Sequence, residues 1–451
     1  MPIKRNSAYQ HLERDNRRAP SVVVIYHFFH PDDVVSARHY SDFAAELARR
    51  GWDVTVLTSN RYCRYPKEKV SIQEEDWNGV HIIRVPRMGW NQADNLSRIC
   101  NAVWMMIGWL VKLRKLPKTD VIVVGSDPQF SQLLFPPIKA LIRPKVLAYW
   151  CFDLFPEAIL ADGASGPVRL LARVIQPLMK RTYRSVDLMV DLGLCMRKRL
   201  DTYNHSAKRE TLIPWALVEP ERLTPPDLPT RHQMFGDAGL ALLYSGNMGK
   251  AHDFMPFLHL ARMLKRINPK IVFCFACRGN RAAELQAAIT RQDTNVRLAP
   301  FAQESELEKR LNSADIHLLS LRPEWQGVVV PSKFFGSLAV GKPVIYAGPE
   351  FSSIAEWVRE FNVGLVLTEK NFKTVAQELL KISRDPDVLK SWQQNAIQTY
   401  QNQFSKEIVM DGWNSMLRQA LSRGLQTTSS NLSVIPQADI PRIRTTQEVD
   451  S

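Results

Sequence analysis

Strand-like and helix-like patterns alternate along almost the whole chain, and this alternation limits the possible folds more than any other feature. Short buried runs rich in β-branched residues predict strands, and amphipathic stretches between them predict helices. This order is typical of parallel sheets covered by helices. The expected strands of the first half are 22–26, 53–58, 81–85, 121–125, 146–152, 188–192 and 211–214, with helices at 37–50 and 95–115 among the connections. Those of the second half are 240–245, 271–276, 296–299, 316–319, 344–347 and 364–367.

The series breaks once, at residues 218–239, which are rich in proline, aspartate and threonine. We interpret this stretch as a linker between two Rossmann-like α/β domains, residues 21–217 and 240–405. Ligands of such sheets bind at the carboxyl ends of the strands. We therefore expect two parallel sheets whose carboxyl ends face a central cleft between the domains. A last helical pattern at 406–424 is expected to pack back toward the first domain. The basic tail 1–20 and the polar tail 425–451 are expected to be disordered.

The composition restricts the class of protein and of partner. With 45% apolar and 23% charged residues, the chain resembles a soluble globular protein. Its formal net charge of +14 favours a negatively charged partner, such as nucleic acid, an anionic membrane or a phosphorylated substrate. No aromatic and basic reading motif stands out, so nucleic acid is not expected. The six cysteines lie mostly in apolar runs, as is typical of a reducing compartment, and a cytoplasmic location is expected.

The stretch 328–345 predicts a turn that ends in Pro-Ser, a short helix and a buried strand. The first turn of a helix has unpaired N–H groups and partial positive charge, and here Ser332 and Lys333 add a hydroxyl and an ammonium group. This combination suits a phosphate. The alternative is an ordinary helix cap with no ligand.

A second loop, 244–250, follows a buried strand and precedes a helix. Its glycines at 246 and 249 allow the backbone to approach a ligand closely, so a diphosphate would fit. A plain strand-to-helix turn explains the same pattern about as well. Gly246, Asn247 and Lys250 are therefore candidate binding residues, and Arg278 is a further candidate cation.

Acidic and histidine side chains follow two strands of the first half. Asp153 ends a buried strand, where its carboxylate can accept a hydroxyl group or act as a base, and Glu157 follows four residues later. A turn cap at Asp153 and a solvated Glu157 are the alternative. His30 and Asp32 lie in the first strand-to-helix loop with Arg38 behind them, and this spacing favours substrate contacts over a metal site.

The helical pattern near residues 99–116 carries Trp104 and Trp109 and ends in a cationic segment. Tryptophan rings beside cations suit the interface of an anionic membrane. A buried helix packed on the sheet is comparably consistent with the pattern.

Taken in order, these motifs resemble glycosyltransferase family 4. The resemblance rests on the Arg-Arg-Gly-Trp-Asp-Val-Thr-Val-Leu-Thr segment at 49–58, Asp-Leu-Phe-Pro-Glu at 153–157, the Tyr-Ser-Gly-Asn loop and Pro-Ser-Lys with Gly-Lys-Pro-Val-Ile. It covers about residues 22–422 and is strongest for the bacterial branch that builds O-antigen, capsule or exopolysaccharide, similar to acetamido-fucose transferases. It implies a GT-B fold, retaining transfer from a nucleotide-activated sugar, and a lipid-linked or saccharide acceptor bound by the first domain. It implies no cofactor and no obligatory metal.

The resemblance also assigns roles to residues. Gly246, Asn247, Ser332 and Lys333 fall where the family holds the donor, and Asp153 falls in the cleft loop near the reacting sugar. Many members carry two glutamates where this chain has Val328 and Gly336. Two other functions therefore stay open: a nucleotide-sugar 2-epimerase of the same fold, and a non-catalytic nucleotide-sugar-binding scaffold.

Overall fold

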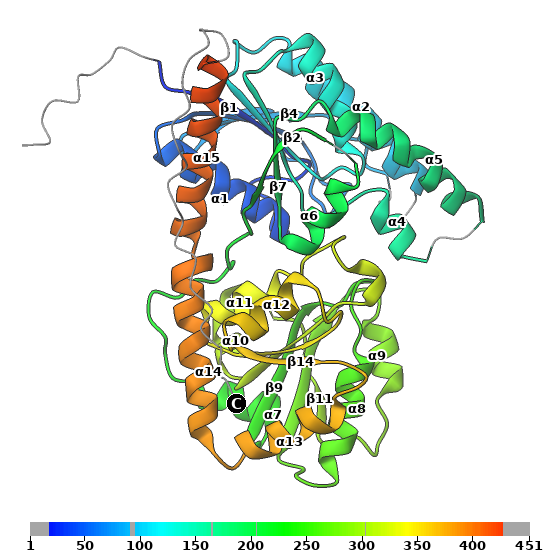
Figure 1. Ribbon diagram of the computed structural model, residues 1–451, viewed down its shortest axis with the longest axis vertical. Coiled ribbons are helices and arrows are strands. Elements are labelled where there is room, and N and C mark those ends of the chain that lie inside the picture. The colour runs from blue at the N-terminus through cyan, green and yellow to red at the C-terminus, as the bar shows by residue number, and fades with distance from the viewer. Residues whose placement is uncertain (1–17, 91–94, 164–165, 204, 303, 427–451) are drawn as a thin grey trace, which may run out of the picture.

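The structure is a computed structural model that describes residues 18–90, 95–163, 166–203, 205–302 and 304–426. Two α/β domains lie one above the other in Figure 1. The first contains an eight-stranded sheet in the order β3-β4-β2-β1-β5-β6-β7-β8. Its strands are β1 (Ser21–Ile25), β2 (Asp53–Ser59), β3 (Glu74–Trp77), β4 (Val80–Val85), β5 (Val121–Gly125), β6 (Val146–Trp150), β7 (Leu188–Asp191) and β8 (Lys208–Thr211).

The second domain contains a six-stranded parallel sheet in the order β11-β10-β9-β12-β13-β14. Its strands are β9 (Leu240–Asn247), β10 (Ile271–Arg278), β11 (Val296–Leu298), β12 (Ile316–Ser320), β13 (Val344–Ala347) and β14 (Gly364–Leu367). In both sheets the central strands are apolar and buried, so the sheet itself is the middle of each domain's core. The predicted fold of two parallel-sheet α/β domains is confirmed.

Helices connect the strands of each domain. In the first domain they are α1 (Val35–Arg49), α2 (Asn95–Leu113), η1 (Ser131–Leu134), α3 (Phe135–Leu141), α4 (Glu157–Ala161), α5 (Gly166–Tyr183) and α6 (Leu194–Asp201). In the second they are α7 (Leu228–Phe235), α8 (Met255–Lys265), α9 (Ala282–Ala288), α10 (Glu304–Asn312), η2 (Pro323–Trp325), α11 (Lys333–Ala339), α12 (Ser353–Glu360), α13 (Phe372–Ile382) and α14 (Pro386–Thr399). A π-helical turn, η3 (Tyr400–Phe404), then leads into α15 (Lys406–Gln426).

Three segments differ from the sequence prediction. The edge strand β3 was not predicted because its residues are mostly acidic, yet it pairs antiparallel with β4. The strand expected at 211–214 lies at 208–211, where a polar segment pairs with β7. Within the predicted linker 218–239, residues 228–235 form α7, which starts at a capping Asp227 and buries Met234 and Phe235 under the second sheet. Polar edge strands and capped helices depend on their neighbours rather than on apolar runs.

The C-terminal helix α15 packs on the first domain, although the segment before it, α14, packs on the second (Figure 1). Trp413 is fully buried, and its ring centroid lies 4.8 Å from that of Phe43 and 5.0 Å from that of Trp150. These aromatic contacts place α15 against the core of the first domain.

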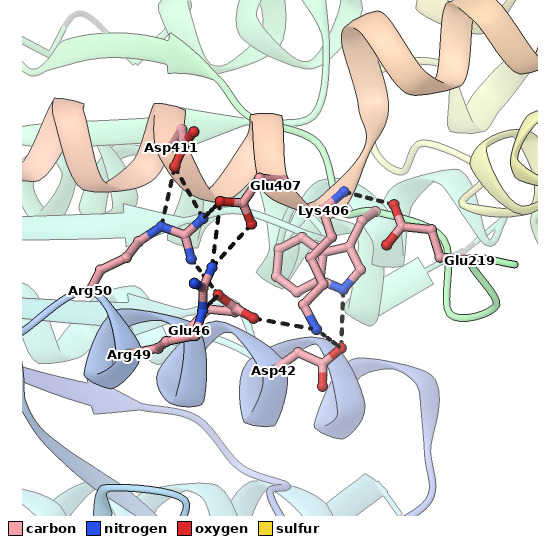
Figure 2. Close-up of polar contacts among 9 residues, drawn as sticks. Asp42, Glu46, Arg49, Arg50, Glu219, Lys406, Glu407 and Asp411 are labelled. Atoms are coloured by element: carbon pink, nitrogen blue, oxygen red, sulfur yellow. Dashed lines mark hydrogen bonds and ion pairs between the residues drawn. The ribbon is translucent and has the colours of Figure 1, made fainter. Parts of the chain in front are cut away.

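An ion-pair network joins α15 to α1 beside this aromatic contact, and Figure 2 shows its members. Arg50 lies between two acidic side chains of α15, with its Nη2 atom 3.1 Å from Asp411 Oδ1. The other members are Asp42, Glu46, Arg49, Lys406 and Glu407. Most of these groups are exposed, so each pair stabilises little, but together they fix how α15 lies along α1.

The two segments that cross between the domains meet at one point. The hydroxyl of Tyr400 donates a hydrogen bond to Glu219 Oε1 at 2.8 Å and accepts one from the backbone N–H of Ala216 at 2.9 Å. Glu219 also accepts the backbone N–H of Lys406 at 2.9 Å. The first crossing, near residue 218, and the second, near residue 404, are therefore tied side by side.

Candidate active site

A cavity of about 550 Å³ lies between the two domains at the carboxyl ends of their strands. Its lining includes every residue predicted to be catalytic or donor-binding: Asp153, Gly246, Asn247, Lys250, Arg278, Ser332 and Lys333. Asp153 comes from the first domain, and the others come from three loops of the second. The structure thus brings together residues that are up to 180 positions apart in the sequence.

Lys333, at the start of α11, is the central cation of this cavity. Its Nζ atom donates to the backbone oxygen of Asn247 at 2.8 Å and lies 3.2 Å from His252 Nε2. Burial lowers the pKa of Lys333 to about 8, so the ammonium form still predominates at neutral pH. A partly buried cation whose partners are a carbonyl and a neutral ring, with no carboxylate among the residues that the structure describes, retains its attraction for an anionic ligand.

His252 is held in one orientation next to Lys333. Its Nδ1 atom lies 2.7 Å from the backbone oxygen of Ser320, so Nδ1 carries the proton and Nε2 is free to accept from the Lys333 ammonium group. Burial, with Lys333 as the next cause, lowers the pKa of His252 to about 3 and keeps the ring neutral. The neutral ring therefore orients the lysine without adding a second charge.

The position of Lys333 leaves no room for a side chain at residue 246, which is glycine. Its φ of 119° is in the region that favours glycine, and a Cβ atom added there would lie 2.8 Å from Lys333 Cε. The second predicted loop and the Pro-Ser-Lys loop are thus in direct contact, which neither motif alone indicates.

The other two candidate cations lie on the same cavity but have partners. The Arg278 guanidinium is stacked over the Phe301 ring, 3.9 Å from its centroid. Lys250 forms an ion pair with Asp162 of the first domain and spans the cleft. Arg278 is therefore held flat against the cavity wall, whereas Lys250 links the two domains.

A second cavity of about 490 Å³ continues the first one into the first domain. Asp153, His39 and Ser332 line both cavities, so the two form a continuous cleft. Burial, with the charge of Asp127 as a second cause, raises the pKa of Asp153 to about 6. A carboxyl group that ionises near neutral pH at a cleft between two domains suits acid, base or charge-stabilising chemistry.

The sequence prediction did not select His39, Asp127 or His252 as site residues. Asp127 follows strand β5 as Asp153 follows β6. The pattern of a carboxylate after a buried strand, which selected Asp153, therefore also applied to Asp127. His39 is buried with no hydrogen-bond partner for Nδ1 among the described residues, and burial lowers its pKa to about 3. Only the fold shows that this helical histidine faces the cleft.

The four residues predicted to bind the acceptor lie outside both cavities of the cleft. The His30 ring stacks on Trp77, with centroids 4.3 Å apart, and the buried Asp32 carboxylate accepts the backbone N–H groups of Cys63 and Val34. Arg38, on α1, does not line either cavity. Glu157 is buried and accepts the hydroxyl of Tyr203. His30, Asp32 and Glu157 thus have partners within the protein, and the prediction that the four residues bind the acceptor stays a prediction.

The two predicted interfacial tryptophans have opposite environments. Trp109 is fully buried, and its Nε1–H donates to the backbone oxygen of Thr58 at 3.3 Å, as the alternative of a helix packed on the sheet expects for this residue. Trp104 is 50% exposed. None of the described helices has the length and apolar character that crossing a membrane requires. In the described part of the chain, no three His, Cys, Asp or Glu side chains cluster as a metal ion would need.

Residues 328 and 336, where many family members carry glutamate, have different surroundings in this structure. Val328 is fully buried, whereas Gly336 lines the cavity and a Cβ atom added there would meet no atom within 4 Å. The space for a side chain at 336 is therefore open.

Comparisons with known proteins agree with this geometry. Residues 36–216 match the family described as glycosyl transferase 4-like domain, and residues 236–399 match glycosyl transferases group 1. The chain is 24% identical over 290 residues to a probable glycosyltransferase, WbjE, of Pseudomonas aeruginosa, covering 62% of this chain and 70% of WbjE.

Solved structures share the fold. WaaG, a glycosyltransferase involved in lipopolysaccharide biosynthesis, superposes with a TM-score of 0.57 at 14% identity, covering 91% of this chain and 100% of WaaG. HepE of Anabaena in complex with UDP has a TM-score of 0.61 at 10% identity, covering 89% of this chain and 100% of HepE.

Two α/β domains around a cleft lined by Lys333 and Asp153 have the GT-B architecture. The two family matches lie one on each domain. The chain belongs to glycosyltransferase family 4 and is a glycosyltransferase.

Proposed function

We propose that the enzyme transfers a sugar, with retention of configuration, from a nucleotide-sugar donor to a lipid-linked or saccharide acceptor during synthesis of a bacterial surface polysaccharide. The observation that carries the donor proposal is the contact of Lys333 with the glycine loop at Asn247. It places an ammonium group and the closely approaching backbone of Gly246 on one wall of the cavity. That combination suits a diphosphate, and HepE, whose fold is similar, is a UDP complex.

In this proposal the leaving diphosphate gains negative charge as the bond between sugar and phosphate breaks. Lys333 would stabilise that charge, assisted by Arg278 and the N–H groups around Ser332. Asp153 would face the reacting sugar from the opposite domain, where its carboxylate can stabilise positive charge or accept a hydroxyl proton. The nucleotide sugar is the only small molecule required besides the acceptor, with no cofactor and no metal.

A thermal-shift series with UDP-, GDP- and ADP-sugars tests the donor proposal, because a ligand that binds only the folded chain raises Tm. We expect stabilisation by UDP-sugars, unchanged by EDTA. If none of the donors shifts Tm, the proposed donor site is wrong. Release of an epimerised nucleotide sugar without acceptor would instead support the 2-epimerase, and donor binding with neither transfer nor slow hydrolysis would support the scaffold.

We further propose that the first domain attaches peripherally to the inner face of the plasma membrane. Four apolar residues of α2 are exposed at intervals of four positions: Ile99, Val103, Ile107 and Val111. The neighbouring α5 exposes Leu170, Val174 and Leu178, and η1 contacts both helices. Arginines and lysines flank these stripes, at Arg114 and Lys115 after α2 and at Arg169 and Arg173 on α5. Apolar stripes flanked by cations suit an anionic lipid surface.

Co-sedimentation with vesicles of phosphatidylglycerol and phosphatidylcholine tests this attachment. Ile107→Glu should reduce the bound fraction several-fold, because it places a charge in the centre of the apolar stripe. Ile267→Glu, at an exposed apolar residue of the second domain, is the matched control. Equal sedimentation of both variants and the unmodified protein would exclude the α2 face as the attachment surface.

A further inference from the structure

The first domain contains a third pocket, which the donor site does not use. This α2 pocket has a volume of about 290 Å³ and lies between α2 and the loops that follow β1 and β5. Its walls are mostly apolar and include Phe28, Met106 and Phe130, while its polar lining residues are His27, Arg98, Asn101, Asp127 and Gln129. The combination of an apolar body and a small polar part is typical of a site for an amphiphilic small molecule.

The pocket connects two surfaces that have been described separately. Ile99 and Val103 line it, and both also belong to the exposed apolar stripe of α2. On the other side, Asp127 and Gln129 line both this pocket and the first-domain part of the catalytic cleft, where Asp153 lies. A molecule in the α2 pocket would therefore have one end at the apolar surface and the other next to the cleft.

His27 supplies a polar group that lacks a partner. Its side chain is only 5% exposed, its ring stacks on Phe28, and Nδ1 lies 3.2 Å from Asp127 Oδ1. The other ring nitrogen, Nε2, is buried and has no hydrogen-bond partner within the described ranges. Buried polar atoms are normally paired, so an orphan at a ligand-sized pocket indicates a group that a ligand completes.

The protonation state of His27 determines whether the ligand group that pairs with Nε2 is a hydrogen-bond donor or an acceptor. Because Asp127 Oδ1 accepts the Nδ1–H of His27, Nε2 presents its lone pair. Burial lowers the pKa of His27, which keeps the ring neutral despite the nearby carboxylate. A lone pair at Nε2 accepts a hydrogen bond, and a sugar hydroxyl group is a suitable donor.

We propose that the α2 pocket binds the acceptor, and that this acceptor is an amphiphile whose hydrocarbon chain leaves along the exposed face of α2 while a hydroxyl of its polar head donates to His27 Nε2. This proposal rests on the proposed function, of which it specifies the acceptor. A free saccharide would leave the apolar walls without a partner, and a plain hydrocarbon would leave His27 Nε2 without one. An amphiphile provides a partner for the apolar walls and for His27 Nε2, and its polar head lies toward Asp127 and Asp153.

Binding of dodecyl maltoside below its critical micelle concentration, measured by titration calorimetry, tests the proposal. Maltose is the head without a tail, and dodecyl dimethylamine oxide is the same tail without hydroxyl groups. Ala102, which lines the pocket, provides the blocking variant Ala102→Trp, and Ile267→Trp adds an indole at an exposed position of the second domain, away from the pocket and from the face of α2. Leu133→Trp, at the partly exposed rim, is a second blocking variant if Ala102→Trp does not fold.

We expect dodecyl maltoside to bind the unmodified protein and Ile267→Trp equally, and to bind the blocking variants at least about tenfold more weakly. His27→Phe keeps an aromatic ring against Phe28 but removes Nε2. It should weaken dodecyl maltoside by about tenfold, as expected for one lost hydrogen bond, and leave dodecyl dimethylamine oxide unchanged.

Three results would overturn the proposal. The first is a folded blocking variant that binds dodecyl maltoside with undiminished affinity, and the second is maltose binding as tight as that of dodecyl maltoside. The third is an equal loss of affinity for both amphiphiles in His27→Phe. The donor thermal shift is measured on the same proteins. If donors stabilise the enzyme but the blocking variants have no effect, the pocket assignment fails and the proposed function stands. If amphiphile binding depends on the pocket but no donor binds, the donor proposal fails instead.

Discussion

The hydroxyl of Tyr400 and the carboxylate of Glu219 are 2.8 Å apart, and this one hydrogen bond joins the two segments through which the domains are connected. Because both crossings lie at the same place, we expect relative movement of the domains to pivot there and to open and close the opposite side of the cleft. Closure of this kind is how transferases exclude water from a reactive donor.

Removing the Tyr400 hydroxyl tests the role of this junction. Tyr400→Phe leaves the buried N–H of Ala216 without an acceptor, which costs about 1–3 kcal/mol. We expect Tm to fall by a few degrees while donor binding is retained. Tyr65→Phe, at an exposed tyrosine, is the control and should not change Tm. An unaltered Tm for Tyr400→Phe would mean that the junction does not contribute to stability.

Lys333→Ala should weaken donor binding strongly. The variant loses a charge-assisted contact with the diphosphate, and hydrogen bonds to charged groups contribute about 1.5–3 kcal/mol, or roughly 10- to 100-fold in Kd. Calorimetric titration with the UDP-sugar that gives the largest thermal shift measures this effect. Lys370→Ala removes an exposed lysine from the same domain and should leave Kd unchanged. Equal affinity of the two variants would exclude Lys333 from the donor site.

Asp153→Asn should reduce kcat more than donor affinity, because the carboxylate faces the cleft from the domain opposite the donor loops. Since its pKa is raised to about 6, the ionised form should be lost as pH falls through that value. We expect kcat of the unmodified enzyme to decrease below about pH 6. The residual rate of the variant should not show this decrease. Losses of kcat and affinity that are equal in size would identify Asp153 as a structural residue.

The same carboxyl group predicts a pH dependence of stability. Its pKa rises from 3.8 to about 6 on folding, so the folded chain holds this proton more tightly than the unfolded chain. The associated stabilisation is complete below about pH 3.8 and is lost as pH rises through about 6. Asp153→Asn removes a carboxylate that is costly to bury, so its Tm relative to the unmodified enzyme should be higher at pH 7.5 than at pH 4. A constant difference across this range would contradict the pKa shift.

The two positions without glutamate should respond differently to its introduction. Gly336→Glu should fold with an unchanged Tm, because the new Cβ meets no atom and the side chain can extend into the cavity. Val328→Glu should lower Tm severely, because it buries a charge without a partner. If Gly336→Glu also strengthens donor binding, position 336 adjoins the nucleoside. A large loss of donor affinity would show instead that the donor occupies the open space.

Much of the fold was predictable because strands such as β1 and β5 are continuous apolar runs, whose pattern does not depend on partners. The polar strands β3 and β8 form only because a neighbouring strand supplies hydrogen bonds, so their own residues give no such signal. That Gly246 and Lys333 lie at strand-to-helix loops was predictable for a similar reason, because both belong to local loop motifs.

The orientation of side chains in the first strand-to-helix loop was not predictable from local motifs. The side chains of His30 and Asp32 turn toward Trp77 and the backbone of Cys63. His27, three residues earlier, faces the α2 pocket instead. The direction of a loop side chain depends on contacts with distant segments, and neither composition nor spacing records them.

The position of α15 has a consequence for how the chain is made. Trp413 covers Phe43 and Trp150 of the first domain, yet it lies near the end of the sequence. Because a ribosome releases the N-terminal part first, the first domain emerges with this aromatic surface uncovered and waits while the whole second domain is synthesised. The domain that starts the chain is therefore the last to be completed, and premature termination anywhere before α15 leaves it with an exposed apolar face.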